Sequence, residues 1–238
     1  MRAVTGIVFD KDGTLFDFAT TWEAWASAFL LRLCTGNRTQ AAEIGKVIGF
    51  DLVRRKFAPS SVVIAGTPGE VGAALHPYFP QMTMGALLEI LNHEAESAPQ
   101  AAAVPLAPLL GELRTQGLRL GVATNDAEKP ARAHLEQAGI TGFFDFIAGY
   151  DSGYGGKPAP GQLLAFATQT GLDPSEVLMV GDSTHDLRAG RAAGMIPVGV
   201  LTGLASQEDL SSFAEVVLPN IGHLPSWLAT RSRSQADD

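Results

Sequence analysis

The chain has little cysteine, a shortage of positive charge and no long apolar run, and each shortage excludes something. Cys34 is the only cysteine among 238 residues, so no internal disulfide is possible and a reducing compartment is expected. Lys and Arg number 17 against 25 Asp and Glu, and this net charge of −8 argues against a nucleic acid or an anionic membrane as partner. There is neither an apolar run of ~18 residues nor a signal-peptide pattern, so we expect a cytoplasmic protein without a transmembrane helix.

What the sequence does contain is a pair of aspartates, Asp10 and Asp12, directly after the apolar run 4–9. This run favours a β-strand, and Gly13 then allows a sharp turn. Side chains alternate along an extended segment, so both carboxylates can share one side while Lys11 points away from them. Two adjacent carboxylates repel each other unless a cation or a shared proton lies between them, and their oxygens suit Mg²⁺.

Short apolar runs alternate with helical patterns over most of the chain. Such runs are typical of strands in a buried parallel sheet. The predicted strands are 4–9, 118–123, 144–148, 177–180, 196–200 and 215–218, and the helices between them are 106–116, 131–138, 162–170 and 187–193, each followed by glycine. This alternation predicts an α/β fold with a doubly wound parallel sheet.

Residues 18–103 interrupt the alternation and are mostly helical in pattern. We predict two domains: an α/β core from 1–17 and 104–238, and an inserted α-helical cap from 18–103 that closes over the site. An apolar stripe on the first cap helix carries Trp22 and Trp25, which we interpret mainly as cap core, although the stripe also offers a dimer surface. We expect a monomer or a homodimer, and a frayed polar tail from residue 231 onward.

Four polar clusters follow four of the predicted strands, and in an open α/β sheet the carboxyl ends of the strands form the ligand site. The clusters are Asp10 with Asp12, Thr124 with Asn125 and Asp126, the glycine-flanked Lys157, and Asp182 with Ser183, His185 and Asp186. Together they suit phosphoryl transfer, because a phosphate ester is anionic and needs cations before a nucleophile can approach it. A purely structural role for each residue, in a solvated turn or a helix cap, does not explain why all four clusters follow strands at the same edge of the sheet.

Each group has a chemical role in this interpretation. Asp10 attacks phosphorus and forms an aspartyl-phosphate, while Asp12 protonates the leaving oxygen and later activates water. Mg²⁺ held by Asp10 and Asp182, together with Lys157, neutralises the phosphate. Thr124 and Asn125 are assigned as hydrogen-bond donors to the phosphate oxygens. Asp126 and Ser183 are assigned as helix N-caps. The histidines are scattered along the sequence, and no metal-ligand spacing joins them.

These motifs resemble the four motifs of the haloacid dehalogenase-like (HAD) superfamily, in its phosphoglycolate phosphatase-like branch with a helical C1-type cap. The segment 10–15 is similar to the first motif, Thr124 to the second, Lys157 to the third, and 181–186 to the fourth. The resemblance implies Asp10 as nucleophile and Asp12 as general acid/base. It implies a Mg²⁺ site formed by Asp10, the backbone carbonyl of Asp12, and Asp182, with Asp186 close by or acting through water.

The resemblance leads us to expect a Mg²⁺-dependent phosphatase for a small phosphorylated metabolite, with 2-phosphoglycolate as the first guess. An intramolecular phosphotransferase such as a sugar-phosphate mutase uses the same core, and a non-catalytic phosphoester-binding module is a third hypothesis. Dehalogenases of the superfamily lack the second acid, so Asp12 argues against dehalogenation. Lys11 replaces a commonly apolar residue, and a salt bridge from it would tune the site. A minority interpretation assigns a cap arginine, Arg54 or Arg55, as anchor for a substrate carboxylate or a second phosphate.

Overall fold

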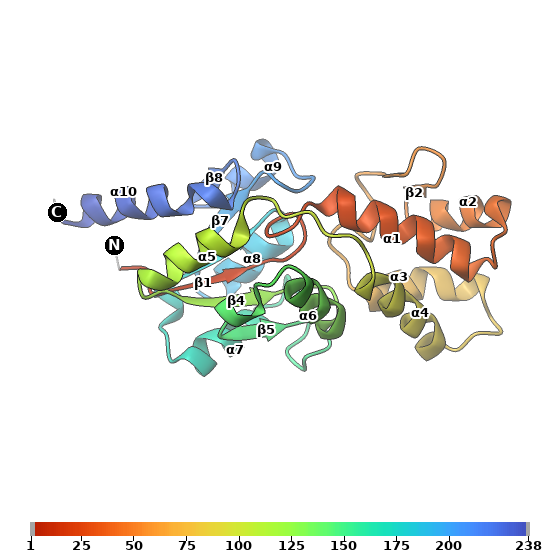
Figure 1. Cartoon of the computed structure of the whole chain (residues 1–238), viewed down its shortest axis with the longest axis horizontal. Coiled ribbons are helices and arrows are strands. Elements are labelled where there is room, and N and C mark those ends of the chain that lie inside the picture. The colour runs from red at the N-terminus through yellow and green to blue at the C-terminus, as the bar shows by residue number, and fades with distance from the viewer. Residues whose placement is uncertain (1–2, 237–238) are drawn as a thin grey trace.

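A computed structural model describes residues 3–236, and its main sheet and its cap helices occupy opposite ends of the molecule (Figure 1). The sheet with helices α5 to α10 forms one end, where both chain termini lie. Helices α1 to α4 and a small hairpin form the other end. The two ends meet where the carboxyl edge of the sheet faces the cap.

The main sheet has six parallel strands in the order β5-β4-β1-β6-β7-β8. Their bounds are β1 (Gly6–Phe9), β4 (Arg119–Ala123), β5 (Phe146–Ala148), β6 (Val177–Gly181), β7 (Ile196–Val200) and β8 (Val216–Leu218). The chain runs outward from β1 through β4 to β5 and, on the other side, through β6 to β8. The order therefore reverses at β1, and such a switch point opens a crevice at the carboxyl ends of the flanking strands.

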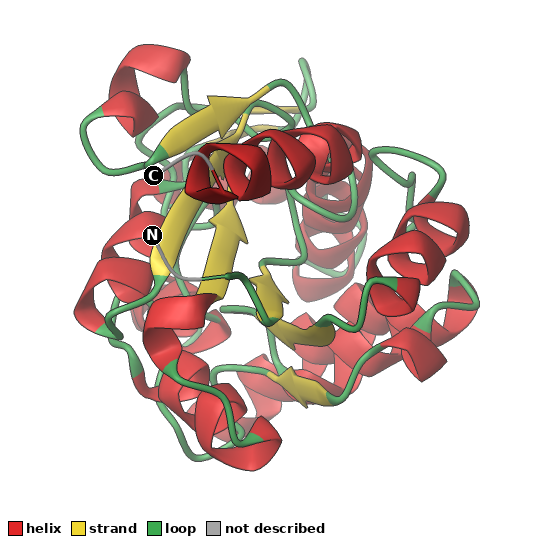
Figure 2. Cartoon of the chain, turned by 90° about the vertical axis from the view of Figure 1, so that its left-hand side faces the viewer, coloured by secondary structure: helices red, strands yellow, loops and turns green. Residues whose placement is uncertain are grey.

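Helices cover both faces of this sheet, as the doubly wound fold requires (Figure 2). One face packs against α5 (Leu106–Thr115), α6 (Glu128–Gln137) and α10 (Leu224–Ala236), and the other against α7 (Gly161–Thr170) and α8 (Thr184–Ala192). A short helix, α9 (Gln207–Ser211), contacts the edge strand β8. Single 3₁₀ turns lie at His76–Tyr78, Thr141–Phe143, Pro174–Glu176 and Ile221–His223.

Strand β1 illustrates why the sheet is buried on both sides. Ile7 and Phe9 belong to the apolar cluster on one face, Val8 belongs to the cluster on the other, and all three are fully buried. Burying one such side chain contributes about 1.5–3 kcal/mol, so the central strand is strongly fixed. Because Asp10 follows Phe9 directly, the position of its backbone is fixed by this packing.

The cap has a hydrophobic cluster of its own, distinct from the two clusters of the sheet. It is built from α1 (Phe18–Leu33), α2 (Arg38–Val47), α3 (Pro68–Leu75), α4 (Met84–Glu96) and the hairpin β2 (Phe50–Asp51) with β3 (Lys56–Phe57). Trp25 is buried here and donates its Nε1 hydrogen to the carbonyl of Leu91 at 3.1 Å. Most of the aromatic stripe on α1 faces this cluster, so our suggestion that the stripe forms a dimer surface was wrong.

Several other expectations can be compared with the structure. The predicted strands and core helices are confirmed to within a few residues, whereas the β2–β3 hairpin was not foreseen. The frayed tail was wrong as far as residue 236, because α10 continues to that point, and residues 237–238 lie outside the described part. None of the described helices is long and apolar enough to cross a bilayer. The domain boundaries at 17/18 and 103/104 stay a prediction.

Candidate active site

Three strand ends bring the candidate residues together at the switch point. Asp10 follows β1, Thr124 follows β4 and Asp182 follows β6, and β4 and β6 are the two neighbours of β1. The backbone register continues this pairing, since the amide of Asp10 donates to the carbonyl of Val180 at 2.8 Å. The convergence expected from the sequence therefore results directly from the strand order.

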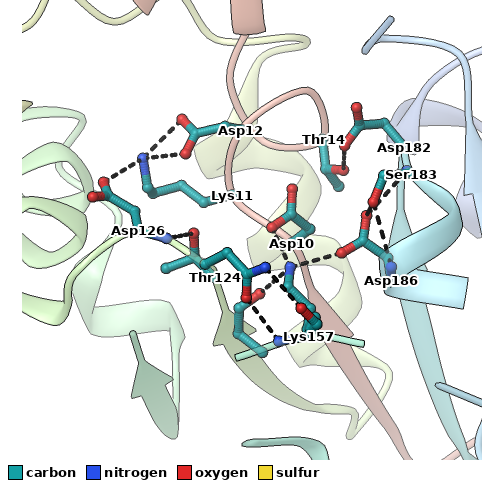
Figure 3. A network of polar contacts seen from close by, with 12 residues as sticks. Asp10, Lys11, Asp12, Thr14, Thr124, Asp126, Lys157, Asp182, Ser183 and Asp186 are labelled. Atoms are coloured by element: carbon teal, nitrogen blue, oxygen red, sulfur yellow. Dashed lines mark hydrogen bonds and ion pairs between the residues drawn. The ribbon is translucent and has the colours of Figure 1, made fainter. Parts of the chain in front are cut away.

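Lys157 is the cation at the centre of this site (Figure 3). Its Nζ atom lies 2.5 Å from Oδ1 of Asp10 and 2.7 Å from Oδ1 of Asp186, and it donates to the carbonyl of Ala123 at 2.8 Å. The side chain is almost fully buried, so the ammonium group is positioned by ion pairs rather than solvated. These neighbouring carboxylates raise the pKa of Lys157 despite its burial, so the ammonium stays charged.

Asp10, Asp182 and Asp186 form a cluster in which one carboxylate oxygen of each lies within 4.8 Å of the others. All three residues are buried. Among the described residues, Lys157 is the one cation in ion-pair contact with this cluster, so three carboxylates face a single ammonium group. The excess of negative charge and the all-oxygen donor set fit a divalent cation such as Mg²⁺.

The titration behaviour of the cluster reflects the same excess of charge. Burial raises the pKa of Asp10 to about 7, with Lys157 opposing the effect and the other carboxylates adding to it. Burial and the carboxylates of Asp10 and Asp186 likewise hold the pKa of Asp182 well above its usual range. A bound divalent cation favours the ionised forms, so metal binding and proton release are linked here.

Gly13 makes the tight turn after the acid pair possible. Its φ of +81° lies in the left-handed region, and a Cβ atom at this position would approach Oδ2 of Asp182 to 2.4 Å. Only glycine satisfies both conditions without moving the carboxylate. The hydroxyl of Thr202 donates to the carbonyl of Gly13 at 2.6 Å, which ties the turn to the loop after β7.

Asp12 does not join the carboxylate cluster. Its two carboxylate oxygens each lie 2.7 Å from Nζ of Lys11, and this lysine side chain is fully buried. The salt bridge considered for Lys11 is present, and it holds Asp12 apart from Asp10 (Figure 3). The expectation that Lys11 points away from both carboxylates was therefore wrong, because its buried ammonium group takes Asp12 as a partner. This arrangement agrees with an Asp12 that supplies a side chain for proton transfer, and at most its backbone carbonyl for metal binding.

Lys11 also joins the core to the cap. Its Nζ atom lies 3.4 Å from Oδ2 of Asp126 and donates to Nδ1 of His134 at 2.9 Å. An ammonium group can only donate, so Nδ1 of His134 accepts and its Nε2 carries the hydrogen that is donated to the carbonyl of Ala95 at 2.7 Å. Ala95 belongs to α4 of the cap, and the ring of Trp22 on α1 lies 5.6 Å from the Lys11 nitrogen.

The buried network sets the charges of its members. Burial and the nearby Lys11 ammonium lower the pKa of His134 to about 4, so the imidazole is neutral at neutral pH. Burial raises the pKa of Asp126 to about 6, with Lys11 opposing the effect. Burial alone would lower the pKa of Lys11, but the carboxylates of Asp12 and Asp126 raise it, so this lysine remains an ammonium.

Asn125 forms a second link between core and cap. Its Nδ2 group donates to the carbonyl of Ala65 in the cap at 2.8 Å and to that of Lys157 at 2.9 Å, while Oδ1 accepts from the amide of Lys157 at 2.7 Å. Both amide hydrogens are thus engaged, and phosphate donation by this side chain would require one of these bonds to open. Thr124 is buried, and its hydroxyl accepts from the amide of Asp126 at 3.1 Å.

A pocket between core and cap connects these groups, with about 660 Å³ of space including its mouth. Its floor is the polar end of the sheet, and its opposite wall comes from the cap. The lining residues are Asp10, Asp12, Thr124, Asn125, Asp126, Lys157, Asp182, Ser183, His185 and Asp186 from the core, with Phe18, Trp22, Trp25, Val63, Ile64, Ala65, Gly66, Pro68, Val71, Leu91, Asn92 and Ala95 from the cap.

The structure brings every candidate site residue of the sequence to this pocket, while their catalytic and metal-binding roles stay predictions. Ser183 caps α8 in a capping box with Asp186, as expected. The N-cap assignment of Asp126 was wrong, because Ala127 occupies that position and Asp126 pairs with Lys11 instead. His134 was missed. Its place on the apolar face of α6, beside Ala131 and Leu135, was the available sign of a buried histidine.

Comparison with known proteins agrees with this geometry. The family model of the haloacid dehalogenase-like hydrolases matches residues 4–194. The chain therefore belongs to this family of hydrolases.

Individual relatives indicate which kind of hydrolase this chain resembles. A phosphoglycolate phosphatase from Salmonella typhi is 38% identical over 212 residues, which are 85% of this chain and 83% of that protein. A phosphoglycolate phosphatase from Rhodospirillum rubrum is 38% identical over 149 residues, 61% of each chain, so this match spans under two thirds of that relative. The expectations of a HAD-like fold and of a phosphatase are confirmed.

Solved structures agree on the fold. A β-phosphoglucomutase from Clostridium difficile superposes with a TM-score of 0.69 over 99% of this chain and 100% of its own, at 17% identity. Similarity at this level of identity shows a shared architecture and says nothing about the reaction.

Proposed function

We propose that this chain is a Mg²⁺-dependent phosphatase that hydrolyses a small phosphate monoester through an aspartyl-phosphate on Asp10. The observation that carries the proposal is the position of Asp10. Its carboxylate lies at the switch point of the sheet, 2.5 Å from the Lys157 ammonium and within the cluster that includes Asp182 and Asp186. A carboxylate that attacks an anionic phosphate needs cations beside it, and Lys157 together with a divalent metal held by the cluster would supply them.

In the first half-reaction, a carboxylate oxygen of Asp10 attacks phosphorus, and the bond between phosphorus and the ester oxygen breaks. Asp12 gives a proton to the departing alkoxide. In the second half-reaction, Asp12 takes a proton from water while the water oxygen attacks phosphorus, and the acyl phosphate bond breaks to restore Asp10. When bound, Mg²⁺ would neutralise charge on the phosphoryl oxygens, and Asp10, Asp182 and Asp186 would hold it.

Lys11 gives this cycle a structural requirement. Asp12 is paired with Lys11 in the structure, and both of its carboxylate oxygens lie at this ammonium group. The Asp12 side chain therefore turns from Lys11 toward the leaving oxygen when it donates its proton, and returns to Lys11 afterwards. Lys11 acts as a positioning residue for Asp12 in this scheme.

The test is release of inorganic phosphate from a panel of phosphorylated metabolites and aryl phosphates, with Mg²⁺ and with EDTA. We expect release with Mg²⁺ only, and a loss of at least about a thousandfold in Asp10→Asn, which keeps the size and shape of the nucleophile. The matched control is Asp151→Asn, an exposed acid outside the pocket. Isomerised product without phosphate release would favour a mutase, and binding without turnover would favour a non-catalytic module.

A further inference from the structure

We infer that the leaving group taken by this pocket is an uncharged, largely apolar alcohol, such as an aromatic one, and not a carboxylate-bearing or bisphosphorylated compound. This inference rests on the proposed function and specifies its substrate class. It follows from two features of the pocket: the apolar surface of its cap wall, and the absence of any lining lysine or arginine other than Lys157 among the described residues.

The wall opposite the carboxylate cluster is apolar and partly aromatic. It is formed by Phe18, Trp22 and Trp25 from α1, with aliphatic side chains such as Val71 and Leu91 from α3 and α4. The indole N–H of Trp25 already donates to the carbonyl of Leu91, so this ring offers an apolar surface to the pocket. Aromatic rings lining a pocket favour contact with flat apolar groups.

No free cation faces this wall among the described residues. Lys157 is the one Lys or Arg that lines the pocket, and it is committed to Asp10 and Asp186. Lys11 lies behind the pocket and is enclosed by Asp12, Asp126 and His134. A second anion on the substrate would therefore lose its hydration without gaining a partner, close to several carboxylates.

The basic residues of the cap hairpin lie elsewhere. Arg54 and Lys56 line a groove on the outer side of the cap, together with Glu43 and Asp51. The side chain of Arg54 is 83% exposed, and Lys56 pairs with Glu23 at 2.8 Å. The idea that an arginine of this hairpin anchors a substrate carboxylate is not supported by the contacts of this pocket.

Asn92 is a polar side chain of the cap wall and lies next to Leu91. Its Oδ1 atom is buried without a hydrogen-bond partner among the described residues. The amide is neutral, so it does not replace the hydration that a substrate carboxylate would lose here. A lysine at this position would add a cation to the wall, so Asn92 is the position at which the inference is tested.

This inference disagrees with our initial expectation that 2-phosphoglycolate is the substrate. The carboxylate of 2-phosphoglycolate would meet the apolar wall and one neutral amide group, with no lysine or arginine among the described cap residues of the pocket to pair with it. A benzyl-type or other arylalkyl phosphate instead places its phosphate on the core side and its ring against Trp22. The relatives named phosphoglycolate phosphatase share the core chemistry, while the pocket wall decides the leaving group.

The test compares benzyl phosphate with 4-carboxybenzyl phosphate, whose leaving alcohols are nearly equal in reactivity and differ in the remote carboxylate. We expect kcat/KM to be at least about tenfold higher for benzyl phosphate. Asn92→Lys should raise the relative value for the carboxylated compound at least about tenfold, and the neutral control Asn92→Leu should not. Equal kcat/KM values for the two compounds in the wild-type protein would overturn the inference.

A binding measurement separates this inference from the catalytic proposal. In Asp10→Asn with Mg²⁺, calorimetry should show tighter binding of benzyl phosphate than of 4-carboxybenzyl phosphate. If no compound releases phosphate in the wild-type protein, the proposed function fails, and the binding preference alone decides the inference. Equal or reversed affinities would contradict it, and far-UV circular dichroism verifies that each variant is folded.

Discussion

The ammonium group of Lys11 lies 2.7 Å from both carboxylate oxygens of Asp12, its immediate neighbour in the chain. This contact separates the two acids of the first motif, one with Lys11 and the other with Lys157. Each of the two acids is thereby paired with its own lysine. Several predictions of stability and activity depend on this division.

Replacing Lys11 by methionine should lower both stability and turnover. The change leaves Asp12 and Asp126 buried without their cation, and breaking a buried pair in this way costs about 3–5 kcal/mol of unfolding free energy. Urea unfolding measures the loss of stability, and kcat should fall because Asp12 loses the group that positions its carboxylate. Lys11→Arg keeps the positive charge, so it should retain part of the stability and part of the turnover that Lys11→Met loses.

Lys129 provides the matched control for Lys11. It also joins α6 to the cap, through an ion pair with Glu96 at 2.7 Å, but its side chain is 80% exposed. Lys129→Met should cost less than about 1 kcal/mol. If both lysine variants lose similar stability, the buried network does not have the importance assigned to it here.

His134 should make the protein acid-sensitive. Its folded pKa of about 4 lies below the usual 6.5, so the unfolded chain binds a proton first as the pH falls. The contribution is complete above pH ~6.5 and is lost as the pH falls toward 4, by up to about 3 kcal/mol. The raised pKa values of Asp10 and Asp126 act in the opposite direction over the same range. Urea unfolding at several pH values therefore tests a difference: the free energy of unfolding of His134→Gln, relative to that of the wild type, should increase as the pH falls from about 6.5 toward 4. His93→Gln, at an exposed histidine of α4, should keep the wild-type slope.

Mg²⁺ binding should strengthen as the pH rises. The pKa of Asp10 is raised to about 7 in the metal-free site, so below this value a proton competes with the metal. One competing proton weakens affinity about tenfold per pH unit below 7. Calorimetry at pH 6 and pH 8 measures the effect, and Asp182→Asn should weaken binding at both. An affinity that does not change with pH would exclude Asp10 as a ligand.

The links made by Asn125 should affect both folding and substrate affinity. Asn125→Ala removes hydrogen bonds to the Ala65 carbonyl and to the backbone of Lys157, which lie on opposite sides of the pocket. Each bond is worth about 1 kcal/mol, so we expect the free energy of unfolding to fall by up to about 3 kcal/mol, and KM to rise because the link across the pocket is lost. The control Asn220→Ala removes contacts at the Ile221–His223 turn and should leave KM unchanged.

Much of the core could be predicted from the sequence because its signals are local. The short apolar runs gave the strands, and the glycine after each core helix gave its end. Once the sheet is parallel, the residues after β1, β4 and β6 must converge, so Asp10, Thr124 and Asp182 could be placed together without coordinates. The fold and the motif positions therefore follow from pattern and topology.

The contacts that tune the site could not be predicted in the same way. Lys11 and His134 lie far apart in the chain, and their bond depends on how α6 packs against the first loop and the cap. The hairpin strands β2 and β3 have two residues each, too few for a periodic signal. Which side chains of the cap face the pocket likewise depends on how the cap helices pack against the core, and the local sequence does not encode this packing.

The most direct test of the account is chemical trapping of the intermediate on Asp10. The protein is mixed with Mg²⁺ and a substrate it turns over, quenched rapidly, reduced with borohydride and analysed by peptide mass spectrometry. Reduction of an aspartyl-phosphate gives homoserine, and we predict this conversion at position 10, dependent on substrate. Continued turnover with no modification at Asp10, together with an active Asp10→Asn variant, would contradict the account.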